Sequence, residues 1–90
     1  MMQFVYNLII QKTNTPIISD VYTNKYSALA DLDNLIKSFT NNGYKLLSKK
    51  ENKEYCQYEY KLHKNNTDVT ITLSKTPIKN YISNIDDLFK

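Results

Sequence analysis

The stretch that most constrains the fold is residues 57–74, where polar and apolar side chains alternate on both sides of an Asn65-Asn66 pair. Such alternation is typical of a β-hairpin with one buried face, and asparagine tolerates the left-handed conformation that a two-residue type I′ turn needs. A one-residue slip would destroy the match between facing side chains, so the pattern predicts the register too. The apolar pairs are Leu62 with Val69, Tyr60 with Ile71 and Tyr58 with Leu73; the polar pairs are His63 with Asp68, Lys61 with Thr70, Glu59 with Thr72 and Gln57 with Ser74.

A third strand is predicted at residues 44–50, antiparallel to the first strand of this hairpin. A three-residue loop at residues 51–53 would again join apolar to apolar across the two strands. It would pair Lys50 with Glu54, Leu46 with Tyr58, and Tyr44 with Tyr60. On this register the side chains of Lys45, Leu47 and Lys49 belong to the polar face.

The first part of the chain predicts two more strands. Residues 3–11 are β-branched and aromatic, with apolar side chains at both parities, which indicates a central strand covered on both faces. Residues 17–23 follow a break that ends at Pro16, and we expect them to pair antiparallel with the first strand.

Between residues 24 and 42 the spacing of apolar residues changes to three and four, which predicts a helix. Its stripe consists of Tyr26, Leu29, Leu32, Leu35 or Ile36, and Phe39. Thr23 or Ser27 is expected to cap its start, and residues 41–43, with the single glycine of the chain, are expected to end it in a left-handed conformation.

The tail predicts a second, shorter helix. Thr76 and Pro77 suit the N-cap and first helical position, or Ser83 caps a shorter final turn. The apolar side of this helix would hold Ile78, Ile82, Ile85 and Phe89 or Leu88. Residues 1–90 are therefore expected to form a single small α+β domain of order ββαβββ(α), whose mostly antiparallel sheet is packed on one face by one long helix.

The residue types at hand argue against an enzyme. Cys56 and His63 are seven apart on one predicted strand, so an odd spacing directs them to opposite faces, Cys56 into the core. Asp31 and Asp33 do not share a helical face, and Asp86 with Asp87 lacks any partner group that would complete a site. One cysteine with one histidine builds no zinc site, and one glycine builds no phosphate loop. We expect no catalytic residue, no metal and no cofactor.

Charge and composition favour recognition of a protein. The net charge is +3, from 12 lysines without any arginine against 9 acidic residues. Arginine is the side chain that binds phosphate and guanine in a bidentate way, so a nucleic-acid-binding regulator is the alternative rather than the first choice. The apolar run in residues 1–10 is too short to span a bilayer, and we expect a cytoplasmic protein without membrane contact. A homodimer is left open.

Lysine, asparagine, isoleucine and tyrosine together make up 40 of the 90 residues, as in AT-rich coding sequences. In size and composition the chain resembles small products of phages and mobile elements that inhibit host proteins, anti-CRISPR proteins among them. The resemblance implies an inhibitor of a host protein or nucleoprotein complex, of the anti-CRISPR or another anti-defence type, acting in the host cytoplasm.

The predicted working surface is the polar face of the sheet, opposite the long helix; the alternative is an interface on the terminal helix or on the outer side of the long helix. The polar face has a mixture of an aromatic, an aliphatic and several cationic side chains that exceeds what a merely hydrated face requires. It is predicted to consist of Lys45, Leu47, Lys49, Tyr55, Gln57, Lys61, Thr70 and Thr72. Tyr55 would anchor a protein partner there, whereas the lysines would follow a backbone if the partner were a nucleic acid.

Overall fold

The computed structural model describes residues 3–77, and its C-terminal hairpin forms as the alternation predicts. Strands β4 (Gln57–Lys64) and β5 (Thr67–Pro77) are antiparallel, and all seven predicted pairs from Gln57–Ser74 to His63–Asp68 are present. Asn65 has a positive φ of 54°, whereas Asn66 is not among the residues with positive φ. The two-residue loop is therefore confirmed, but the type I′ geometry, which needs positive φ at both positions, is wrong.

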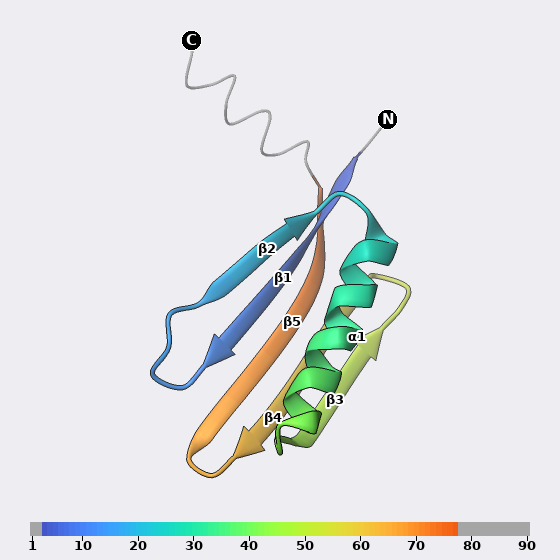
Figure 1. Cartoon of the computed structure of the whole chain (residues 1–90). Coiled ribbons are helices and arrows are strands. Elements are labelled where there is room, and N and C mark those ends of the chain that lie inside the picture. The colour runs from blue at the N-terminus through green and yellow to red at the C-terminus, as the bar shows by residue number, and fades with distance from the viewer. Residues whose placement is uncertain (1–2, 78–90) are drawn as a thin grey trace.

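The described chain forms a ββαβββ domain of the α+β class, as expected (Figure 1). Its five-stranded sheet has the order β2-β1-β5-β4-β3, and all neighbouring strands are antiparallel. The other elements are β1 (Phe4–Lys12), β2 (Ile18–Tyr22), α1 (Lys25–Asn41) and β3 (Lys45–Asn52). Consequently β2 and β3 form the two edges, and the N-terminal and C-terminal strands β1 and β5 pair in the interior.

Helix α1 lies over one face of the sheet and closes the core there (Figure 1). Ala28 and Leu32 are buried, and Leu29, Leu35, Ile36 and Phe39 pack around the core, so most of the predicted stripe is confirmed. Tyr26 is the exception, with 77% of its surface exposed. At 3.6 residues per turn it lies roughly 120° around the helix from Leu32, and Ala28 takes the inward position in this turn.

The ends of α1 show one correction and one agreement. The N-cap is Asn24, whose Oδ1 accepts hydrogen bonds from the backbone N–H of Tyr26 at 2.8 Å and of Ser27 at 3.2 Å. The expected caps, Thr23 and Ser27, are wrong because the helix begins at Lys25, directly after Asn24. At the other end Gly43 has a φ of 91°, the left-handed stop that was expected.

The predicted register of β3 is wrong. Leu46 pairs with Leu62, Lys49 with Tyr60 and Glu51 with Tyr58, instead of Leu46 with Tyr58. The turn comprises residues 53–56 rather than 51–53, and Cys56, expected within the strand, ends that turn with a positive φ of 51°. The side chain of Cys56 nevertheless reaches the core and is 3% exposed. A register shift between Leu46 and Ser48 then leaves Leu47 without a cross-strand partner, which is a bulge.

Two further expectations are corrected, one on the burial of β1 and one on the end of β5. Strand β1 is interior, but only Leu8 among its nine residues is buried, because no helix of residues 3–77 covers the second face of the sheet. Thr76 and Pro77 do not start a helix; they end β5 and pair with Val5 and Phe4. The rest of the predicted terminal helix lies outside the described residues.

No helix within residues 3–77 has the length and apolarity needed to cross a membrane.

Candidate protein-binding surface

The uncovered side of the sheet, called here the open face, carries the even-numbered residues of β5 from 68 to 76 and the residues that pair with them. Gln57, Lys61, Thr70 and Thr72 of the predicted surface lie on this face, because Lys61 pairs with Thr70, and Gln57 and Thr72 share their parity. Lys45 joins them through its pairing with His63. The structure thus brings five of the eight predicted residues onto one face.

The other three predicted residues lie elsewhere. Lys49 is opposite Tyr60 and therefore on the helix side of the sheet. Leu47 is the unpaired residue of the bulge, and Tyr55 belongs to the β3–β4 turn; they are 59% and 62% exposed. The open face consequently lacks the aromatic residue that was expected to anchor a partner on it.

Acidic side chains lie among the basic ones on the open face. His63 Nδ1 lies 2.6 Å from Asp68 Oδ1, and Lys50 Nζ lies 3.9 Å from a carboxylate oxygen of Glu59. Between these charges, Thr70 and Thr72 present half-buried hydroxyl groups. A backbone of phosphates favours a row of cations, so this mixture of charges does not favour nucleic acid.

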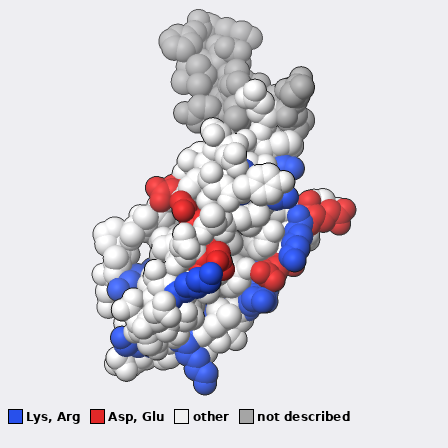
Figure 2. Space-filling model, turned by 45° about the vertical axis from the view of Figure 1, so that its right-hand side comes forward, with Lys and Arg blue, Asp and Glu red and all other residues white. Residues whose placement is uncertain are grey.

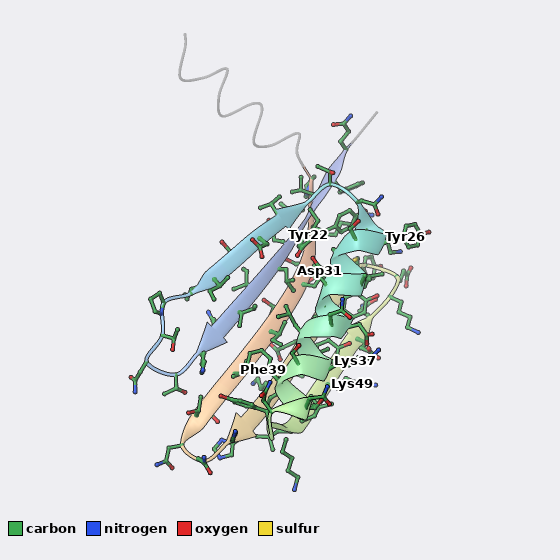
Figure 3. The ribbon with its side chains drawn as sticks, in the orientation of Figure 1. Tyr22, Tyr26, Asp31, Lys37, Phe39 and Lys49 are labelled. Atoms are coloured by element: carbon green, nitrogen blue, oxygen red, sulfur yellow. The ribbon has the colours of Figure 1, made fainter. Side chains whose placement is uncertain are left out.

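A second surface is a groove between α1 and the β3–β4 hairpin, with a volume of about 380 Å³, called here the helix–hairpin groove. Its floor is apolar and aromatic, and its rim is charged. The floor is formed by Leu29, Leu32, Ile36, Tyr58 and Tyr60, and the rim by Lys25, Asp33, Glu51 and Lys53, with Tyr26 beside them. In Figure 3, Tyr26 projects outward from the start of α1, and with 77% of its surface exposed its ring is available to a partner.

The observed register of β3, which differs from the predicted one, gives the groove its polar rim. Because Glu51 faces the helix side, the hydroxyl of Tyr60 donates a hydrogen bond to its carboxylate. This bond is the main cause that lowers the pKa of Glu51, and Lys49 Nζ, 3.7 Å away, adds to it. Burial, followed by the same carboxylate, raises the pKa of Tyr60. The hydroxyl therefore stays protonated and the carboxylate charged over the neutral range.

Charges of both signs also surround the groove on the helix. Lys37 Nζ lies 2.9 Å from Asp33 Oδ2, an i,i+4 pair on the exposed side of α1. Figure 2, which brings the right-hand side of Figure 1 forward, shows lysine and acidic side chains interspersed over this face rather than a patch of one sign. Interspersed charges suit a protein surface with its own mixed charges.

The structure separates the residues that were considered for chemistry. Cys56 lies in the core at the end of the turn before β4, and His63 lies near the far end of that strand on the open face. Among residues 3–77 no group of three or more His, Cys, Asp or Glu side chains is placed to hold a metal ion. Asp86 and Asp87 lie outside the described residues.

Sequence reasoning missed the helix–hairpin groove. One signal for it was available but was not used: Tyr26 was assigned to the apolar stripe, although at 3.6 residues per turn it lies roughly 120° around the helix from Leu32. The contact between Tyr60 and Glu51 had no such signal, because it depends on the length of the turn at residues 53–56.

Comparison of the chain with protein-family models, curated proteins and solved structures finds no significant match. No residue role can therefore be transferred from a relative. The function has to be inferred from the two surfaces, the open face and the helix–hairpin groove.

Proposed function

We propose that the chain is a non-enzymatic protein-binding module that binds its partner through the helix–hairpin groove. The observation that carries this proposal is an apolar groove with a rim of mixed charge, next to the exposed ring of Tyr26. Protein interfaces commonly have an apolar centre and a polar rim, and tyrosine is enriched among the residues that dominate binding energy. Tyr55 lies in the same turn as the rim residue Lys53 and adds a second exposed ring.

The electrostatics support a protein over a nucleic acid. Asp33 and Glu51 on the rim would repel phosphates at the place where the aromatic rings are available. A nucleic-acid-binding regulator that uses Lys45 and Lys61 of the open face is the second candidate function. It is the weaker one, because Glu59 and Asp68 lie among those cations and the chain has no arginine.

The size and residue usage of the chain, 90 residues of which 40 are lysine, asparagine, isoleucine or tyrosine, support a more specific version. We propose that the partner is a host protein and that the chain is an inhibitor encoded by a phage or another mobile element, of the anti-CRISPR or another anti-defence type. Steric occupation of a functional surface would suffice for inhibition, so no catalytic residue is needed.

The partner is best sought by affinity capture from bacterial lysate with and without nuclease, followed by binding measurements on purified variants. Tyr26→Ala is expected to weaken binding by at least about tenfold, because its exposed ring lines the groove, and Tyr55→Ala to weaken it measurably, because its ring is exposed in the turn that carries the rim residue Lys53. Thr72→Ala on the open face is the matched control and should bind as the wild type does. The Lys45→Ala/Lys61→Ala double variant should change affinity little.

The same measurements at about 50 mM and about 300 mM salt separate the two candidate functions. A protein interface with a charged rim should lose affinity only moderately, mainly through slower association. A steep loss with salt, together with a strong effect of the lysine variant and none of Tyr26→Ala, would overturn the groove proposal in favour of nucleic acid on the open face.

A further inference from the structure

The two edges of the sheet differ in how they are protected against pairing. The outer strand β3 carries Lys45, Lys49 and Lys50 and contains the bulge at Leu47, devices that keep other strands from adding to an edge. The opposite edge strand, β2, has no lysine and no bulge. Its apolar residues Ile18 and Val21, and Ile17 just before the strand, are between 52% and 65% exposed, and within residues 3–77 no strand pairs with its outer side.

The hydrogen-bond pattern identifies which groups of β2 are unpaired. The backbone N–H of Thr13, just after β1, donates to the carbonyl of Asp68 at 3.0 Å. Because the backbone groups of successive residues in a strand point to opposite sides, the odd-numbered residues of β1 bond to β5 and its even-numbered residues bond to β2. Even residues of β1 lie opposite even residues of β2. The N–H and C=O groups of the odd residues, Ser19 and Val21 with Ile17 just before the strand, therefore point to the free edge.

We propose that a second copy of this chain pairs with β2 antiparallel, about a two-fold axis at Ser19, and joins the two sheets into one. A two-fold interface uses the same surface of both copies. If residue i of one copy contacts residue j of the other, then residue j of the first copy also contacts residue i of the second. Centred on Ser19, the pairing places Ile17 opposite Val21 of the second copy, twice, and Ser19 opposite Ser19. All three pairs are hydrogen-bonded ones, with two backbone bonds each.

Side-chain chemistry selects this register and this occupant. The four apolar side chains that the pairing brings together, Ile17 and Val21 of both copies, lie on the open face, where they are 63% and 65% exposed in one copy. A register centred on Asp20 would instead set two carboxylates directly opposite each other, which is destabilising. In the register on Ser19, Asp20 lies opposite Ile18 of the second copy.

The pairing does not depend on the proposed function. The helix–hairpin groove lies beside β3, at the other edge of the sheet, so both grooves stay accessible in the pair. The interface rests on a strand of only five residues, and we expect an exchange between monomer and dimer rather than an obligate dimer.

Sedimentation of the full chain from about 5 µM to about 500 µM tests the proposal, and a mass that rises towards that of a dimer is expected. Val21→Lys puts a charge at the interface and Ser19→Pro removes a free-edge N–H, so both should stay monomeric across this range. Leu47→Lys is the matched control, because it changes a similarly exposed apolar residue of the other edge strand, and it should dimerise as the wild type does. Thermal unfolding establishes that each variant is folded.

A cross-link tests the register. The Cα atoms of a hydrogen-bonded antiparallel pair are about 5.5 Å apart, within the range that a disulfide spans, so Ser19→Cys should oxidise to a covalent dimer. Asp20→Cys should cross-link much less, and the wild type, whose Cys56 is buried, should not. A wild type that stays monomeric at the highest concentration, an equal loss of dimer in Leu47→Lys, or faster cross-linking of Asp20→Cys would each overturn the proposal.

Discussion

At the scale of the residue, the hydrogen bond from Tyr60 to Glu51 joins the floor of the helix–hairpin groove to its rim. The pKa of Glu51 is lowered from 4.5, chiefly by this bond. A carboxyl group whose pKa is lower in the folded state stabilises the fold above its unfolded-state pKa, and this stabilisation is lost as the pH falls through the folded-state pKa. The bond therefore makes the groove sensitive to acid.

Tyr60→Phe is expected to raise the pKa of Glu51 towards 4.5, because the donor of the hydrogen bond is removed while the ring stays in the floor. Unfolding free energy should then depend less on pH in the acid range just below that value. Titration of the side-chain carboxyl signals by NMR measures both carboxylates in one spectrum, and Glu59, on the open face, is the internal control. An unchanged pKa of Glu51 in the variant would contradict this role of Tyr60.

Ile71 and Thr70 test the two faces of the sheet within one strand. Ile71 is fully buried opposite Tyr60, whereas Thr70 lies on the half-exposed open face. Ile71→Ala should lower the free energy of unfolding by about 2 to 5 kcal/mol through lost burial and a cavity. Thr70→Ala should change it by only about 0.5 kcal/mol. Urea denaturation measures both, and equal effects would show that the faces are assigned wrongly.

At the scale of the element, α1 depends on Asn24 for its first turn. Its side chain satisfies two backbone N–H groups that have no partner inside the helix. Asn24→Ala should therefore cost about 0.5 to 2 kcal/mol of stability, measured by thermal or urea unfolding. Thr23→Ala is the control, since Thr23 precedes the cap and makes no capping bond in the structure. A larger loss in Thr23→Ala than in Asn24→Ala would contradict this assignment.

Elements also differ in how well their sequence defines them. The β4–β5 hairpin was predictable because its alternation runs unbroken through both strands and its loop is short. Strand β3 was not, because adjacent Leu46 and Leu47 fit either register, and the turn before β4 lacks glycine although Cys56 adopts positive φ. The cap at Asn24 was missed for a simpler reason: the adjacent Thr23 is also a common capping residue, and the better capping preference of asparagine was not used to decide between them.

At the scale of the whole molecule, the working surfaces depend on packing between elements distant in sequence. Five of the eight residues predicted for the open face lie there, because the parity of β4 and β5 and the N-terminal part of β3 was right. Apart from the outward position of Tyr26, the helix–hairpin groove could not be predicted, since it forms where α1 leaves part of β4 and β3 uncovered. The distance of a helix from each strand is set by the packed core and not by any local pattern.

The bulge at Leu47 and the lysines of β3 have a consequence for growth of the sheet. A sheet that could pair at both of its edge strands would add copies without end, and such open-ended addition is how fibres form. Here a copy that pairs through β2 offers only the edge of β3 to the next copy, and that edge resists pairing. The bulge therefore limits the proposed assembly to two copies. Pairing through β2 covers an exposed apolar edge that would otherwise favour aggregation.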